Sequence, residues 1–154
     1  MDAFDFIKQD HDRFREMFKE FGNAGDRAYK TKLDIANALF DELAAHETME
    51  EEMLYPAIRE DASRDGKEMI LEGFEEHHVA DEIIEELKEL DPEAENYDAK
   101  FKVLQENVEH HLEEEELELF PEARKVLGDR AEEIGEKLEA RKKELMKGDP
   151  ARTR

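Results

Sequence analysis

The chain has 154 residues, of which 45 are acidic and 23 are Lys or Arg, so its formal net charge is -22. This length predicts a single domain with a buried core. The negative charge repels phosphate, which argues against nucleic acid and membranes as partners. Cysteine is absent, which excludes disulfides, thiolate nucleophiles and cysteine-ligated metals. No apolar run approaches the roughly 20 residues that span a bilayer, and the N-terminal segment lacks a signal-peptide pattern, so we expect a cytoplasmic protein.

Glycine and proline gather in short breaks that divide the chain into five stretches. Within the stretches, apolar residues recur at spacings of three and four, as in Phe4, Ile7, Phe14 and Phe18. This period predicts amphipathic helices rather than strands. Long helices joined by short breaks pack antiparallel. We therefore expect an all-α fold, an up-and-down antiparallel four-helix bundle with an extra C-terminal helix. The breaks lie at residues 22–26, 61–66, 91–95 and 128–129.

The same breaks predict the domain organisation. We expect one domain over residues 1–147, with the bundle core at 1–125 and the fifth helix at about 129–147. Residues 148–154 are expected to form a flexible tail.

Histidines fall on the apolar side of the first four stretches. At about 100° per residue, each stretch directs one histidine to the core, and two stretches add a glutamate one turn later. A single core histidine is usually satisfied by a hydrogen bond. Several buried imidazoles and carboxylates together would cost on the order of 1–3 kcal/mol each unless a shared partner such as a metal satisfied them. The core-facing residues are His11, His46, Glu50, His77, His111 and Glu115, whereas His78 is rotated to the edge and His110 faces away.

An internal repeat selects the same residues. Residues 46–56 align without gaps on residues 111–121, and both segments read HxxxEE followed by an apolar residue, an aromatic residue and proline. His11 and His77 are separated by nearly the same offset, 66 residues against 65. The chain therefore resembles two helical hairpins, each with one histidine on its first helix and an HxxxE motif on its second.

The donor set of the cluster limits the metal. Imidazole nitrogen and carboxylate oxygen without thiolate suit Fe, Mn or Zn. Two glutamates on opposite helices are placed to bridge two ions about 3.5–4 Å apart. Ferritin-like proteins use a Glu-x-x-His motif instead, so the order here, with histidine first, argues against iron storage of that type.

The paired HxxxEE…P motifs, together with His11 and the EEHH segment that ends at His78, resemble the hemerythrin-like (HHE cation-binding) domains over residues 1–125. The resemblance implies a four-helix bundle that holds an oxo- or hydroxo-bridged di-iron centre, with two Fe ions in preference to Mn or Zn. It also implies the roles of the ligands. The terminal ligands would be His11, His46, His77 and His111, and the bridging ligands Glu50 and Glu115.

Asp81 departs from the family pattern. Oxygen-carrying hemerythrins have a further histidine one turn after the third-helix ligand, and that position is Asp81 in this chain. Asp81 is predicted to face the core beside His77. It is therefore a candidate metal ligand, a hydrogen-bond partner for a ligating imidazole, or a residue beside an open coordination position. The substitution argues against reversible oxygen carriage.

The resemblance leads to a di-iron protein that binds or reacts with O2, peroxide or nitric oxide, in sensing, binding or detoxification. One alternative is a catalase-like or ferroxidase-like di-iron enzyme, in which Tyr55 is either an electron source or, because Phe120 replaces it in the other repeat, a packing residue. Another is a metal-free acidic interaction module. We expect a small diatomic or peroxide ligand as partner, and a monomer or weak homo-oligomer. The residues expected to line the ligand pocket are Phe14, Phe18, Leu43, Phe74 and Leu104.

Overall fold

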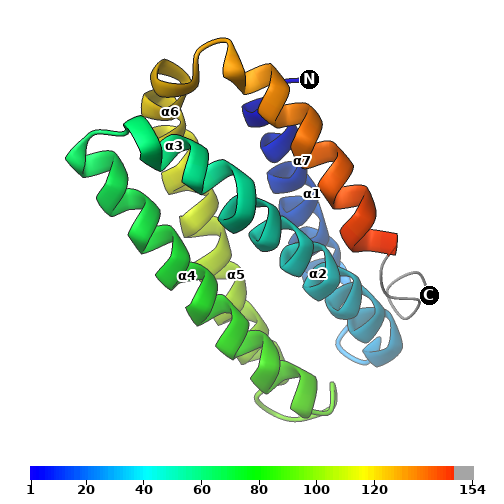
Figure 1. Ribbon diagram of the computed structural model, residues 1–154. Helices are drawn as coiled ribbons and strands as arrows, with labels where there is room; N and C mark the ends of the chain where they lie inside the picture. The colour runs from blue at the N-terminus through cyan, green and yellow to red at the C-terminus, as the bar shows by residue number, and fades with distance from the viewer. Residues whose placement is uncertain (148–154) are drawn as a thin grey trace.

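The computed structural model describes residues 1–147, and all of its regular elements within that range are helical. The predicted tail at 148–154 lies outside the described residues. Figure 1 shows the expected bundle, in which α1, α2, α4 and α5 are the four long helices and α7 is the extra C-terminal helix. The predicted fold class is confirmed. The elements are α1 (Ala3–Asn23), α2 (Tyr29–Met49), η1 (Glu50–Leu54), α3 (Tyr55–Asp61), α4 (Arg64–Glu89), α5 (Tyr97–Glu114), η2 (Glu115–Leu119), α6 (Phe120–Leu127) and α7 (Arg130–Lys147).

The starts of two bundle helices are fixed by side chains. Asp2 accepts a hydrogen bond from the backbone N–H of Asp5 at 2.8 Å, and Ser63 accepts one from Gly66 at 3.1 Å. Each cap satisfies one of the backbone donors that a helix N-terminus leaves free. Among residues 1–147, no helix has the length and apolarity needed to cross a membrane.

Two long helical segments of the bundle each contain a π-helical turn. The turn η1 joins α2 to α3, and η2 joins α5 to α6. In both, proline follows shortly afterwards, Pro56 in α3 and Pro121 in α6. Proline has no N–H and its ring crowds the carbonyl four residues earlier, so a wider turn relieves the conflict. The N–H of Tyr55 accordingly donates to the carbonyl of Glu50, five residues back. The repeat seen in the sequence is therefore also a repeat of backbone geometry.

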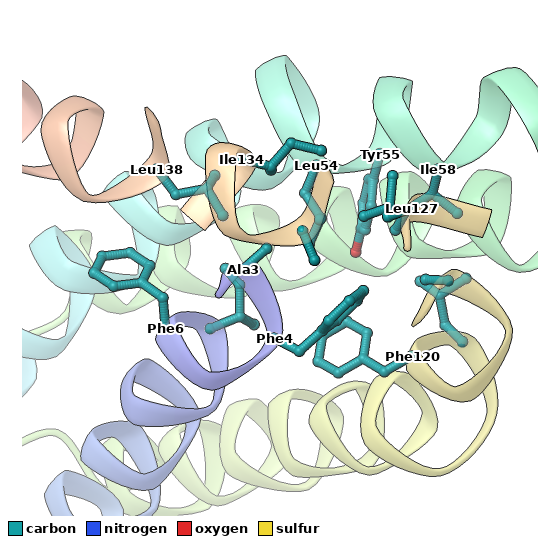
Figure 2. Close-up of a cluster of buried hydrophobic side chains, with 14 of the residues drawn as sticks. Ala3, Phe4, Phe6, Leu54, Tyr55, Ile58, Phe120, Leu127, Ile134 and Leu138 are labelled. Atoms are coloured by element: carbon teal, nitrogen blue, oxygen red, sulfur yellow. The ribbon is translucent and has the colours of Figure 1, made fainter. Parts of the chain in front are cut away.

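α7 packs along α1 and α2 and covers one side of the bundle. Gly135 allows this approach, because a Cβ atom at that position would lie 2.8 Å from the backbone nitrogen of Ala3. Ile134 and Leu138 of α7 are buried against the start of α1, as Figure 2 shows.

The buried apolar side chains form two clusters. One joins the start of α1 to η1, α3, α6 and α7 and includes Phe4 and Phe120, whose ring centroids are 5.2 Å apart (Figure 2). The other occupies the opposite end of the bundle and includes Phe18 and Phe101. His11 lies between Ile7 and Phe14 along α1, which belong to different clusters. The core histidines and glutamates therefore form a polar layer between two hydrophobic layers.

Candidate metal centre

The fold buries all six residues that were predicted from helical facing and the repeat. Each of them has at most 6% of its surface exposed. One histidine comes from each of α1, α2, α4 and α5, and the two glutamates come from the π-helical turns. The buried residues are His11, His46, Glu50, His77, His111 and Glu115.

The six side chains form two overlapping groups. Within each group, the candidate ligand atoms all lie within 4.8 Å of one another. We call them the first position and the second position. Glu50 belongs to both groups. The first position consists of His11, His46, Glu50 and Glu115, and the second of Glu50, His77 and His111.

Both glutamates lie between histidines of different hairpins. Glu50 Oε1 lies 3.3 Å from His46 Nε2 and 3.1 Å from His77 Nε2. Glu115 Oε1 lies 3.1 Å from His11 Nε2 and 3.5 Å from His111 Nε2. A carboxylate that contacts histidines of two neighbouring groups has the arrangement of a bridging ligand.

Each core histidine has a second carboxylate at its other ring nitrogen. The Nδ1 N–H donates to this carboxylate, so the lone pair of Nε2 points to the centre of the cluster. The distances from Nδ1 are 2.6 Å for His11 to Glu116, 2.9 Å for His46 to Asp10, 2.7 Å for His77 to Glu51 and 2.8 Å for His111 to Glu76.

These four carboxylates were missed in the sequence analysis. Asp10 and Glu76 immediately precede His11 and His77, and Glu51 and Glu116 immediately follow Glu50 and Glu115. They therefore obey the internal repeat. The repeat was the signal that could have found them, because a carboxylate directly beside a ligand recurs in both hairpins.

Two buried atoms of the cluster have no hydrogen-bond partner within the described part of the chain, Glu50 Oε2 and His46 Nε2, although His46 Nε2 keeps its ion-pair contact with Glu50 Oε1 at 3.3 Å. Leaving such an atom unpaired in a protein interior costs on the order of 1–3 kcal/mol. Both atoms are shielded from solvent, and both are of the type that binds Fe, Mn or Zn. The residues present therefore fit a metal centre.

In the metal-free protein, attraction between protonated histidines and carboxylates stabilises the cluster. Burial by itself lowers the pKa of His46, but the negative charges of Glu50 and Asp10 outweigh burial and raise it to about 10. Burial likewise opposes the hydrogen bonds from Glu50 and Glu51 that raise the pKa of His77 to about 9. The pKa of Glu50 is held well below its usual value, since the charge of His46 outweighs the effect of burial. Imidazolium groups thus occupy the place of a metal cation and neutralise the carboxylates.

Tyr55 directs its hydroxyl into the cluster. The hydroxyl donates to Glu115 Oε2 at 2.7 Å and lies 3.4 Å from both Glu50 Oε1 and His111 Nε2. Gly73 makes room for it, because a Cβ atom there would lie 2.8 Å from the Tyr55 oxygen. The ring of Tyr55 does pack, stacked on His77 at 5.7 Å, but the packing interpretation missed the hydroxyl. Phe120, its counterpart, stacks on His11 at 6.0 Å and has no polar atom to offer.

The expectation that Asp81 faces the core is wrong. Asp81 is exposed and belongs to neither metal position. The carboxyl group that approaches His77 from this side is that of Glu47 on α2, whose ligand atom lies within 4.8 Å of those of His77 and Glu51. Burial, reinforced by a hydrogen bond with Asp81, raises the pKa of Glu47 to about 9. His78 and His110 are exposed, as predicted, and pair with Glu82 and Glu114 on their own helices.

Two cavities reach the cluster from different sides. One, which we call the apolar cavity, has walls of Leu43, Ala80, Val108 and Leu112. It touches His46, His77 and His111 and is also lined by Glu47, Glu76 and Asn107. The other touches His111, Glu115 and Tyr55, and its remaining lining includes Glu72, Glu76, Glu114 and Glu118. Of the five residues expected to line a ligand pocket, Leu43 alone lines the apolar cavity. Phe14 instead packs edge-on against His46, and Phe74 packs on Tyr55.

Comparison with known proteins agrees with this architecture. A hemerythrin-like protein of Schizosaccharomyces pombe is 27% identical over 117 residues, which is 76% of this chain and 57% of the yeast protein. A protein of Nostoc described as a DNA nickase is 28% identical over 120 residues, or 78% of this chain and 33% of that protein. The chain therefore spans between a third and about three fifths of the length of these relatives.

A solved structure shows the same fold. The crystal structure of a hemerythrin HHE cation-binding domain-containing protein from Mycobacterium kansasii superposes with a TM-score of 0.83 at 21% identity, covering 96% of this chain and 89% of that one. The profile of the family described as "Hemerythrin HHE cation binding domain" matches residues 2–123. That match covers most of the chain, and so the protein belongs to the hemerythrin HHE cation-binding domain family.

Proposed function

We propose that the cluster holds two iron ions and that this di-iron centre binds or reacts with O2, peroxide or nitric oxide. The observation that carries the proposal is the direction of the imidazoles. All four Nδ1 atoms are held by carboxylates, so four Nε2 atoms converge on two glutamates that lie between them. Manganese and zinc accept the same donors, but a histidine-rich site in this family supports iron.

The roles of the chain's residues follow from their contacts. His11 and His46 would hold one ion and His77 and His111 the other, with Glu50 and Glu115 between them. Bound iron supplies Lewis acidity and redox chemistry. The four outer carboxylates fix the ring orientations of the histidines and increase the basicity of their Nε2 atoms. The two apolar layers around the cluster limit the access of water.

Tyr55 supports an enzymatic version of this function, a catalase-like activity on peroxide. Its hydroxyl oxygen lies 2.7 Å from Glu115 Oε2, to which its O–H donates inside the cluster. Burial and the neighbouring carboxylates raise the pKa of Tyr55 well above its usual value, so the proton stays on the phenol at ordinary pH. A phenol that keeps its proton at this place can donate a hydrogen bond to a molecule in the site, which Phe120 in the other repeat cannot do.

The first test is metal content with an absorption spectrum on freshly purified protein. We expect two iron ions per chain and the absorption of an oxo-bridged pair. His111→Ala should lose iron, because it removes an Nε2 atom from the second position. His110→Ala is the matched control, since it removes the neighbouring exposed imidazole. Equal iron loss in the two variants would refute the assignment of ligands.

Gas detection after addition of peroxide separates an enzyme from a binding or sensing protein. Rapid oxygen evolution by the iron-loaded protein, lost in Tyr55→Phe at unchanged iron content, would support the catalase-like activity. Absence of oxygen evolution in the loaded wild-type protein would reject it and leave ligand binding as the function.

A further inference from the structure

The two hairpins differ at one core position beside the metal centre. Phe14 on α1 and Ala80 on α4 are separated by 66 residues, the same offset that relates His11 to His77. The ring of Phe14 packs edge-on against His46 at a centroid distance of 5.1 Å and fills the space there. Ala80 is also buried, but its methyl group leaves space, and it lines the apolar cavity that touches His77 and His111. The cavity therefore exists on the α4–α5 side because a small residue stands where the other hairpin has phenylalanine.

Asn107 places an unsatisfied polar atom at this cavity. It lines the apolar cavity, and its Oδ1 atom is buried without a hydrogen-bond partner among residues 1–147. The corresponding residue of the first hairpin is Glu42, offset by 65 residues, and that side chain accepts from Arg13 at 3.4 Å. Buried carbonyl oxygens are normally paired, because an unpaired one costs on the order of 1–3 kcal/mol. Asn107 thus presents a free acceptor to whatever occupies the cavity.

The rest of the lining restricts the occupant. Leu43, Ala80, Val108 and Leu112 supply apolar walls, and Glu47 and Glu76 also line the cavity, so it favours an uncharged molecule over an anion. The second cavity is lined by five glutamates against two in the apolar cavity, Glu72, Glu76, Glu114, Glu115 and Glu118, and is therefore the more charged environment. A neutral ligand therefore finds its better environment on the side of Ala80 and Asn107.

We propose that the small-molecule ligand binds in the apolar cavity beside His77 and His111, and that Asn107 accepts a hydrogen bond from it. This inference rests on the proposed di-iron function and specifies which half of the centre the ligand reaches. The free acceptor selects a ligand that carries an O–H group, which is the chemistry of hydrogen peroxide. O2 and nitric oxide carry no hydrogen atom and therefore cannot donate to Asn107.

The first experiment fills the cavity and measures binding rather than turnover. Ala80→Leu adds three carbon atoms to the cavity, and Ala36→Leu adds the same atoms to the same apolar cluster away from the site. Both iron-loaded, reduced proteins are titrated with nitric oxide, followed by absorption. We expect at least about tenfold weaker affinity in Ala80→Leu and an affinity within about twofold of wild type in Ala36→Leu. Ala80→Val, a smaller addition, replaces Ala80→Leu where the latter binds less iron.

The second experiment removes the acceptor. Asn107→Leu keeps the approximate size of the side chain, so nitric oxide affinity should stay within about twofold of wild type. The peroxide concentration at half-maximal rate should rise about fivefold to tenfold, because one hydrogen bond is lost. Gln105→Leu is the matched control, since Gln105 donates to Glu109 away from the cavity. Its nitric oxide and peroxide constants should equal those of wild type.

The outcomes distinguish this inference from the proposed function. A wild-type protein that binds no iron would refute the proposed function, and the inference with it. Iron-loaded Ala80 variants that bind nitric oxide as tightly as wild type would refute the location of the ligand while leaving the di-iron function intact. An unchanged peroxide constant in Asn107→Leu, or an equal loss of nitric oxide and peroxide affinity, would refute the role of Asn107.

Discussion

The two metal positions have matching histidines but different charges behind them. In the first position, both outer carboxylates are paired with cations. Asp10, the partner of His46, accepts from Lys142 of α7 at 2.5 Å, and Glu116, the partner of His11, lies 3.0 Å from Arg15. In the second position, Glu51 and Glu76 have no ion pair with lysine or arginine in the described part of the chain. The residue that matches Arg15 by the repeat is Asp81, which carries the opposite charge.

The comparison shows how a duplicated ligand set can give two unequal sites. A carboxylate that accepts from an imidazole N–H makes the ligating nitrogen more basic, and a cation bound to that carboxylate withdraws part of the effect. The outer carboxylates of the second position lack the cations that those of the first position have, and the second position is also the one beside the apolar cavity. The histidines of the two positions are matched, so the charges and cavities around those histidines distinguish the two positions.

Removal of the shared ligand should have the largest effect, because it abolishes both positions at once. Glu50 belongs to both groups, whereas His11 and His77 each belong to one. We expect Glu50→Ala to weaken binding of both ions by more than about 100-fold, since loss of an outer partner alone costs about 10–100-fold. His11→Ala and His77→Ala should each weaken mainly one ion. Metal titration with stoichiometry measures this, and retention of one tightly bound ion by Glu50→Ala would contradict the shared role.

The pH dependence of stability should have opposite directions with and without metal. The folded-state pKa values of His46 and His77, about 10 and about 9, lie above the ordinary histidine value of 6.5. Their contribution to metal-free stability is therefore complete below about pH 6.5 and is lost as the pH rises through 9 to 10. Glu47 acts in the same direction, because its pKa is raised from 4.5 to about 9. The melting temperature of chelator-treated protein should fall across this range.

The iron-loaded protein should behave differently, because its ligating histidines are bound as neutral imidazoles. Acidification protonates them and releases metal, so stability should fall toward low pH. Thermal unfolding of the two forms over one pH series measures both profiles. A metal-free melting temperature that rises between pH 6.5 and 10 would contradict the ion pairs of the cluster.

The difference between Tyr55 and Phe120 can be tested through Gly73. Gly73→Ala places a methyl group 2.8 Å from the Tyr55 oxygen, so the ring must move and its hydroxyl should lose Glu115. Overpacking of this kind costs about 1–3 kcal/mol of unfolding free energy. Gly22→Ala is the control, because no atom lies within 4 Å of its added methyl group and alanine favours a helix. Denaturant unfolding measures both variants, and equal stability of the two would show that Gly73 does not position Tyr55.

Sequence periodicity was sufficient for the helices, the fold class and the facing of His11, His46, His77 and His111. These depend on the regular α-helical angle, which holds along α1, α4 and most of α2 and α5. Prediction from periodicity failed where the rotation per residue along the helix changes. In the π-helical turn, Tyr55 is bonded to the carbonyl five residues back, so it lies over Glu50 where a regular helix would place Leu54.

Asp81 shows a second limit of prediction from helical periodicity. Its angle on α4 is close to that of His77, but an angle does not say which neighbour fills the space. Glu47 of α2 occupies that space, and Asp81 remains at the surface beside it. The outer carboxylates and the cavity beside Ala80 also depend on which helices face each other. Pairwise packing of this kind requires the assembled bundle.

The pairing of Lys142 with Asp10 gives the finest test of the two positions. Lys142→Met removes the charge, keeps the apolar stem and leaves α7 packed on α1 through Leu138. Asp10 should then accept more strongly from the Nδ1 N–H of His46, so that His46 Nε2 becomes a stronger donor to a bound metal. We expect a shift in the spectroscopic signal of one iron toward that of the other, with a change in iron affinity of less than about tenfold because the carboxylate itself remains. Lys143→Met, one residue further on, is the control. Mössbauer spectra of both variants measure the shift, and an unchanged separation of the two iron signals in Lys142→Met would mean that α7 packs against the bundle without influencing its metal.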